Sequence, residues 1–324
     1  MSLAKKSPQS RALDCVLEID FKPMKEKGED TFAYSFADNA MHTQAVFDGC
    51  GGSGSWQYAE FRNATGAFVA AQSMSKAYLD WFNATPADVL ADPARAGASF
   101  EAMASRTLAA LKQSCAPMKV SGSMVRSFPC TASIVLAAPK AGGLSVTALN
   151  VGDSRVYYLT PEKGLVQVTV DDSQEDPMET LRSSAPMTDM LNADNPFTVK
   201  CRQFRLDYPC AVLTATDGVF GYVRSPMDFE YLLLKTIEGS ANFAQLEETF
   251  RDEIVSVTGD DSTCIMSFYG WGSYAAVKEG LRRRYEHMRA MVGALDKAEL
   301  DGTLDTVLEK TWDSYRKQTL YDEM

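Results

Sequence analysis

Hydrophobic and polar residues alternate, or gather in short apolar runs, over much of the chain, and this spacing predicts many short strands. Alternation over residues 11–21 and 31–36 and the apolar run 44–47 are each typical of a β-strand. Further strands are expected at 131–138, 144–151, 155–159, 201–206, 211–216 and 262–269. Because turns rich in Gly, Pro, Asn and Asp join neighbouring strands, the pattern indicates antiparallel meanders and not parallel β-α-β units.

Apolar residues at helical spacing predict helices between and after these strands. One stripe starts at Trp56 and runs to about residue 82, and a second covers about 97–115. Helical patterns also occupy about 226–237 and 242–256. Residues 170–200 are acidic and weakly patterned, so we expect a surface excursion there. His42, just before the third strand, is expected to be a turn residue, although it could also approach a functional site.

The end of the chain has a different pattern from the rest. Two amphipathic stripes, one from Tyr274 and one from Leu304, predict a pair of helices that dock on the main domain. We therefore expect one domain over 10–270 and a helical extension over 271–324. Docking of a partner, dimerisation and simple packing are all open roles for this extension.

Composition narrows the class of protein. No apolar run among the 324 residues reaches the ~20 that span a bilayer, and no apolar segment follows the first lysines, so neither a membrane span nor a secretory signal is expected. The seven cysteines form no CxxC pair, which favours reduced thiols and a cytoplasmic location. A net charge of −11 without a basic stripe argues against a nucleic-acid partner.

Three acidic residues lie beside glycine at the end or start of a predicted strand. These are Asp48-Gly49, Asp217-Gly218 and Gly259-Asp260. Glycine allows a tight turn and leaves a backbone carbonyl free to face a ligand. The carboxylates could therefore meet in space and bind a divalent cation, although Asp is also an ordinary turn residue.

Several stretches, in the same order, make the chain similar to the metal-dependent type 2C protein serine/threonine phosphatases. Asn150-Val151-Gly152-Asp153-Ser154-Arg155 contains that family's Gly-Asp-Ser-Arg unchanged. The other matching stretches are Glu29-Asp30, Val46-Phe47-Asp48-Gly49-Cys50-Gly51-Gly52, Thr131-Ala132, Val168-Thr169-Val170-Asp171-Asp172-Ser173, Thr216-Asp217-Gly218 and Asp260-Asp261-Ser262-Thr263. The resemblance covers about residues 10–270 and excludes the helical tail.

This resemblance implies an α+β fold, a four-layer α/β/β/α sandwich of two antiparallel sheets flanked by helices. It also implies two Mn²⁺ or Mg²⁺ ions at one end of the sandwich. Asp48 would bridge both ions and the Gly49 carbonyl would bind the first. Asp217 and Asp260 would hold the second ion, and Glu29 would contribute through water. Asp30 either binds a metal or orients its loop.

Two departures from the family pattern affect catalysis. Cys50 stands where the family has the His that protonates the leaving alkoxide, and a thiol, with a pKa of about 8.5, is a poorer match to neutral pH than imidazole. Lys25 stands where the family has a phosphate-gripping Arg, and it can act as a point charge but not as a bidentate fork. Lys27 could substitute for it, or both lysines could simply be solvated.

A third departure concerns an additional metal ion. Asp153 sits where some family members bind a third ion, but the partner expected four residues after Asp217 is replaced by Gly221. A third site is therefore doubtful. The alternative is that Asp153 and Arg155 form a local salt bridge that braces their loop.

The function expected from the sequence is metal-dependent hydrolysis of phosphoserine and phosphothreonine in a phosphoprotein substrate. A weak or inactive relative that binds metal and phosphoprotein as a regulatory module is the main alternative. An acidic Ca²⁺-binding structural module is disfavoured, because no clustered Asp-x-Asp loop is present.

Overall fold

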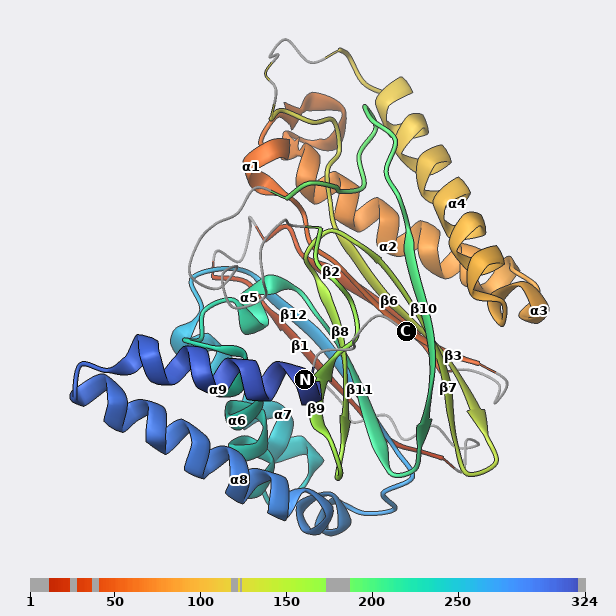
Figure 1. Cartoon of the computed structure of the whole chain (residues 1–324). Coiled ribbons are helices and arrows are strands. Elements are labelled where there is room, and N and C mark those ends of the chain that lie inside the picture. The colour runs from red at the N-terminus through yellow and green to blue at the C-terminus, as the bar shows by residue number, and fades with distance from the viewer. Residues whose placement is uncertain are drawn as a thin grey trace.

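Two five-stranded antiparallel sheets form the centre of the molecule, as the computed structural model shows (Figure 1). The structure describes residues 12–23, 28–36, 41–117, 122, 124–172 and 187–319. The first sheet has the order β1-β12-β11-β8-β9 and the second β10-β7-β6-β3-β2. All pairings are antiparallel, as the short strands and tight turns predicted.

The strands coincide with most of those expected from the alternation of apolar residues. The first sheet contains β1 (Leu13–Phe21), β8 (Arg155–Thr160), β9 (Gly164–Gln167), β11 (Cys210–Ala215) and β12 (Ser262–Tyr269). The second contains β2 (Thr31–Ser35), β3 (His42–Phe47), β6 (Ala132–Lys140), β7 (Gly143–Val151) and β10 (Lys200–Asp207). β9 was not expected, because four residues are too few to establish a period.

Helices cover the outer face of each sheet. The second sheet is covered by α2 (Gly66–Ala84) and α4 (Pro93–Gln113), with the short α1 (Gly51–Gly54) and α3 (Ala87–Leu90) nearby. The first sheet is covered by α6 (Pro226–Gly239), α7 (Phe243–Val257), α8 (Tyr274–Leu300) and α9 (Leu304–Thr319), and the one-turn α5 (Asp217–Phe220) follows β11. The expected four-layer α/β/β/α sandwich is confirmed.

The apolar residues divide among three cores, one between each pair of adjacent layers. Residues such as Val135, Val212 and Ile265 fill the space between the sheets. Buried Gln44 joins the two sheets there, because its amide nitrogen donates to the carbonyl oxygens of Val212 at 3.2 Å and Ile265 at 2.9 Å. These bonds satisfy a polar side chain in a buried position and fix how one sheet lies on the other.

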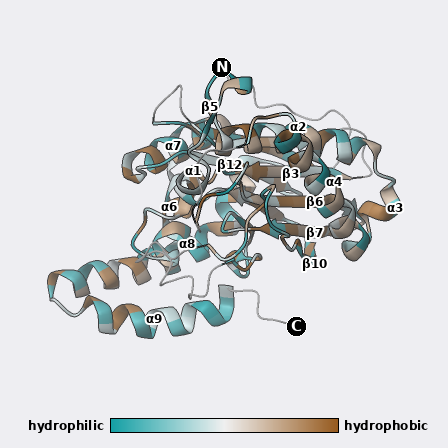
Figure 2. Ribbon diagram, turned by 90° about the horizontal axis from the view of Figure 1, so that it is seen from above, coloured by the Kyte–Doolittle hydropathy of each residue, from teal (hydrophilic) through white to brown (hydrophobic). Residues whose placement is uncertain are grey.

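The C-terminal helical pair α8–α9 packs on the side of the sandwich opposite α2 and α4 (Figures 1 and 2). Its buried residues belong to the same core as the first sheet and include Val277, Leu281, Met288, Leu308 and Trp312. No helix within the described ranges is long and apolar enough to cross a membrane.

The helical stripe expected from Trp56 begins too early. Residues after Trp56 instead form β4 (Gln57–Tyr58), a 3-10 turn (Ala59–Phe61) and β5 (Ala64–Thr65), before α2 begins at Gly66. The reason is local, because Arg62 and Asn63 have left-handed φ angles of 57° and 61°, which an α-helix cannot accommodate. Thr65 then caps α2 by accepting a hydrogen bond from the Phe68 amide at 3.2 Å.

Two further expectations were wrong. His42 is not a turn residue but the fully buried first residue of β3, stacked on Tyr269. Part of the 170–200 segment is not a surface excursion, since Leu191 is fully buried and forms a β-bridge with Cys130. Residues 173–186 of that segment lie outside the described residues.

Candidate active site

The sequence-predicted acidic residues lie at one end of the sandwich. Asp48 follows the last residue of β3, and Glu29 and Asp30 precede β2, its antiparallel neighbour. In the other sheet, Asp217 follows β11, and Asp260 precedes β12, which pairs with β11. An antiparallel pair places the end of one strand beside the start of the next, so both sheets deliver carboxylates to the same edge.

A hydrogen-bond network joins the two sheets at this edge. The Thr216 hydroxyl donates to Asp30 Oδ2 at 2.7 Å and accepts from the Thr263 amide at 3.0 Å. Asp261 Oδ2 accepts from the Glu29 amide at 2.5 Å. These contacts hold the loop that carries Glu29 and Asp30 against the first sheet.

The sequence did not identify Thr216 or Asp261 as site residues. Each is next to a predicted metal ligand, Asp217 or Asp260, so the signal was present in the matching stretches. Their role depends on contacts across more than 180 residues of sequence, which no local pattern reveals.

Glycine is required where the loops of the site approach each other most closely. A Cβ at Gly49 would lie 2.7 Å from the Glu29 Cβ and 2.9 Å from the Ala67 carbonyl oxygen. A Cβ at Gly218 would lie 1.8 Å from the Asp261 carbonyl oxygen. The Asp-Gly pairs therefore serve tight packing of backbone around the carboxylates, as the sequence suggested.

The loop with Asp153 reaches the same place from between β7 and β8. Its backbone is held by Asp172, whose Oδ2 accepts from the Gly152 amide at 2.7 Å and whose own amide donates to the Gly152 carbonyl at 2.9 Å. Asp153 Oδ1 is buried and has no hydrogen-bond partner. An acceptor in that condition is an unusual feature of a folded protein and indicates a group that a ligand would satisfy.

The predicted salt bridge between Asp153 and Arg155 is not present, and Arg155 pairs instead with Asp171. Arg155 Nη2 lies 2.7 Å from Asp171 Oδ2 and Nε lies 3.0 Å from Oδ1, and both side chains are buried. The guanidinium also lies 4.2 Å from the centre of the Phe220 ring. The acid that pairs with Arg155 is therefore not the one nearest to it in sequence.

The carboxylates repel one another because little positive charge lies among them. Burial, and then the charges of Asp217 and Asp261, raise the pKa of Asp30 to about 8. Burial, and then Asp217 and Asp171, likewise raise the pKa of Asp153 to about 8. Burial, and then the charge of neighbouring acids, also raise the pKa of Asp48 and Asp217. Bound cations would remove this penalty, since they favour the ionised form of every carboxylate around them.

The Cys50 side chain lies close to the same acidic residues. Burial, followed by the charges of Asp48 and Asp153, raises the pKa of its thiol well above the usual value. Its backbone is fixed, because the Cys50 amide donates to the Pro129 carbonyl at 3.2 Å and its carbonyl accepts from the Gly54 amide at 2.8 Å. The group is therefore a protonated thiol at the start of α1. Lys25 lies outside the described residues.

The chemistry of these donors fits hard divalent cations, which prefer carboxylate, carbonyl and water oxygens. The Asp30 and Asp48 carboxylates lie close enough for each to shift the pKa of the other. Asp260 is exposed at the rim of the site. Burial is the largest cause of the raised pKa of Asp217, and the charge of Asp260 raises this pKa further. As they stand, no three His, Cys, Asp or Glu side chains of the described chain are gathered tightly enough to enclose an ion. The donors nevertheless converge, and pairs of carboxylates share protons when no cation lies between them.

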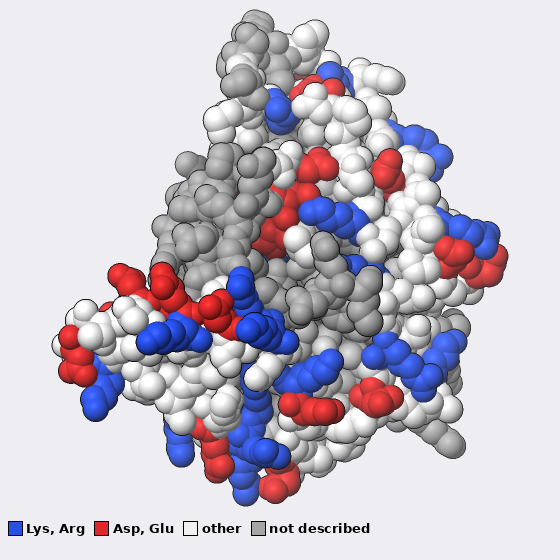
Figure 3. Space-filling model, viewed as in Figure 1, with Lys and Arg blue, Asp and Glu red and all other residues white. Residues whose placement is uncertain are grey.

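In the space-filling view, acidic side chains gather in a hollow near the upper centre of the molecule, and basic side chains lie beside them (Figure 3). An acidic hollow of this kind raises the local concentration of cations.

Solved structures share this fold. The serine/threonine phosphatase Stp1 from Staphylococcus aureus superposes with a TM-score of 0.59 at 18% identity, over 82% of this chain and 99% of that one. The catalytic domain of the phosphatase PstP, in complex with two manganese ions, has a TM-score of 0.55 at 17% identity, over 80% and 99%. A sex-determining protein of C. elegans has a TM-score of 0.58 at 16% identity, over 85% of this chain and 69% of that one. At such identities the likeness establishes the fold alone.

The sequence itself establishes the family. The family model described as protein phosphatase 2C matches residues 25–252, which is more than half of the chain. The chain thus belongs to the protein phosphatase 2C family, and this membership places it among the protein serine/threonine phosphatases, whose substrates are phosphoproteins. No curated protein matches the sequence significantly.

Proposed function

We propose that the chain hydrolyses phosphoserine and phosphothreonine in proteins with the help of two divalent cations, Mn²⁺ or Mg²⁺, held at the acidic end of the sandwich. The observation that carries this proposal is the convergence of Asp30, Asp48 and Asp217 from both sheets, each with a raised pKa. The PstP structure with two manganese ions supports it, because that protein has the same fold.

Asp48, Asp217 and Asp260 would hold the ions, with the Gly49 carbonyl beside them. Glu29 and Asp30 would complete the site, either directly or through water, and Thr216 keeps Asp30 in position. When bound, the two ions would supply an activated water and neutralise charge on the phosphoryl oxygens.

The remaining chemistry would be carried out by Cys50 and Lys25. Cys50, as a protonated thiol, would donate its proton to the leaving alkoxide of serine or threonine. Lys25 would hold the phosphate as a point charge. Asp153, with a buried and unpartnered carboxylate oxygen, could approach an ion, but Gly221 offers no side chain to share a third one.

The test is Mn²⁺-dependent hydrolysis of an aryl phosphate and of a phosphothreonine peptide, with parallel titration of Mn²⁺ by calorimetry. We expect Asp217→Asn to lower activity by more than ~100-fold. Mutation of a residue that supports a metal ligand typically costs about 10–100-fold, and mutation of the ligand itself should cost more. Asp252→Asn is the matched control, since Asp252 is an exposed acid of α7 whose ion pair is with its neighbour Arg251.

The outcomes separate the possible functions. Activity that needs Mn²⁺ and disappears in Asp217→Asn supports the enzyme. Tight Mn²⁺ binding without turnover of either substrate would instead indicate a phosphatase-like binding module. No Mn²⁺ binding would contradict the metal site itself.

A further inference from the structure

The C-terminal helices α8 and α9 follow the part of the chain that the family model matches, which ends at residue 252. They nevertheless reach the segment that carries Asp217. That segment is α5, a single turn of four residues that begins at Asp217 and ends at Phe220. One helical turn has almost no stability of its own, so the orientation of α5 depends on what packs against it.

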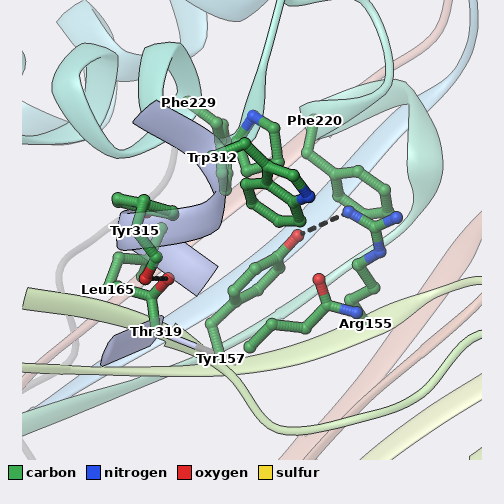
Figure 4. A pocket seen from close by; sticks show the side chains of 10 residues that line it. Arg155, Tyr157, Leu165, Phe220, Phe229, Trp312, Tyr315 and Thr319 are labelled. Atoms are coloured by element: carbon green, nitrogen blue, oxygen red, sulfur yellow. Dashed lines mark hydrogen bonds between the residues drawn. The ribbon is translucent and has the colours of Figure 1, made fainter. Parts of the chain in front are cut away.

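Helix α9 faces α5 across a small cavity lined by aromatic residues. Trp312 and Tyr315 of α9 line a small cavity of about 20 Å³ together with Arg155, Tyr157 and Phe220 (Figure 4). Trp312 is buried, and a space of this size holds no more than about one water molecule. The Trp312 ring therefore closes the side of Phe220 that would otherwise face a void.

Phe220 is held firmly on its other sides. Its ring centre lies 4.2 Å from the Arg155 guanidinium carbon, 6.0 Å from the Tyr157 ring and 6.2 Å from the Phe229 ring. The packing around Phe220 is thus coupled to Asp217 by the backbone of α5, a single turn that contains both residues.

Helix α8 holds the segment just after α5. Arg224 forms ion pairs with Asp296 at 2.9 Å and Glu299 at 2.8 Å, both near the end of α8, and with Asp228 of α6 at 2.6 Å. A network of this kind fixes a side chain better than a single exposed pair does. The stretch from Asp217 to Arg224 is therefore secured by α9 at one end and by α8 at the other.

We propose that the C-terminal helical pair is a positioning element for Asp217. Trp312 acts through Phe220, and Asp296 and Glu299 act through Arg224, and together they hold the turn in the orientation that binds a divalent cation. The helical pair is therefore a working part of the catalytic unit and not a separate docking module. This inference rests on the proposed metal-dependent function.

The test compares Mn²⁺ affinity, measured by calorimetry on the full chain, among three variants of α9. We expect Trp312→Ala to weaken Mn²⁺ binding about 3- to 10-fold, which is less than the 10- to 100-fold effect of residues that contact a metal ligand directly. Trp312→Phe keeps an aromatic wall and should restore most of the affinity. Leu308→Ala is the matched control, because Leu308 is equally buried in α9 but does not line the cavity beside Phe220.

A second variant avoids the core altogether. Asp296→Asn combined with Glu299→Gln removes two exposed acids and detaches Arg224 from α8, while its ion pair with Asp228 of α6 remains. We expect about a 2- to 3-fold loss of Mn²⁺ affinity with little change in melting temperature. This variant decides the question if Trp312→Ala does not fold.

Unchanged Mn²⁺ affinity in both variants, or an equal loss in Leu308→Ala, would overturn the proposal. A parent chain that binds no Mn²⁺ would overturn the proposed function as well, and the two failures are distinguished by the parent titration.

Discussion

A buried ion pair anchors the C-terminal helical pair to the sandwich, and its removal should destabilise the whole protein. Glu230 of α6 is fully buried and accepts from Arg284 of α8 at 2.6 and 2.7 Å. It also accepts from the Tyr315 hydroxyl of α9 at 2.7 Å and from the Leu165 amide of β9 at 3.0 Å. One carboxylate therefore joins three separate elements to its own helix.

Glu230→Gln keeps the shape of the side chain but removes the charge. Arg284 would then be a buried cation without its partner, a change that costs about 3–5 kcal/mol. With an unfolding entropy of ~2 cal/mol/K per residue, a chain of this length has ~0.7 kcal/mol/K at its melting temperature. The melting temperature should consequently fall by about 4–7 °C.

The assay is thermal unfolding followed by circular dichroism, with urea unfolding as an independent measure. Glu253→Gln is the control, because it breaks the exposed ion pair of Lys235 and Glu253 and should cost less than ~1 kcal/mol. Adding Arg284→Met to Glu230→Gln should recover part of the loss, since the unpaired charge is then gone. A shift below 2 °C in Glu230→Gln, or no recovery in the double variant, would refute the reasoning.

Three further predictions concern pH, catalysis and metal binding. Burial lowers the pKa of His42 to about 4, so the folded state prefers the neutral ring and stability should fall as pH drops from 6.5 towards 4, by up to about 3 kcal/mol. His42→Phe should reduce this loss of stability at acidic pH, measured by urea unfolding at a series of pH values. An unchanged pH dependence would contradict the role of His42. Cys50→His should raise the rate on a phosphothreonine peptide more than on an aryl phosphate, because only the alkoxide needs a proton to leave, and equal gains would argue against Cys50 as the proton donor. Thr216→Val removes the hydrogen bond to Asp30 and leaves the Thr263 amide unsatisfied. It should weaken Mn²⁺ binding by about 10-fold and lower the free energy of unfolding by ~1–3 kcal/mol. Parental Mn²⁺ affinity in calorimetry would exclude this role of Thr216.

Much of the fold was predictable from sequence because its signals are local. Strands such as β3 and β12 are buried on both faces and read as apolar runs, and amphipathic stripes revealed α4, α6, α7, α8 and α9. The exception after Trp56 shows the limit of periodicity. Tyr58 and Phe61 have helical spacing, yet the left-handed residues Arg62 and Asn63 turn the chain into a small hairpin.

The sequence by itself determined which residue types stand at the strand ends, since Asp48-Gly49, Asp217-Gly218 and Gly259-Asp260 each adjoin a recognisable strand. The tertiary structure decided which of these groups meet and what supports them. It paired Arg155 with Asp171 and not with Asp153, and it joined Asp30 to Thr216 across the two sheets. It also placed Trp312 and Phe220 around the same small cavity. These contacts depend on how layers distant in sequence pack together, and local propensity carries no information about that packing.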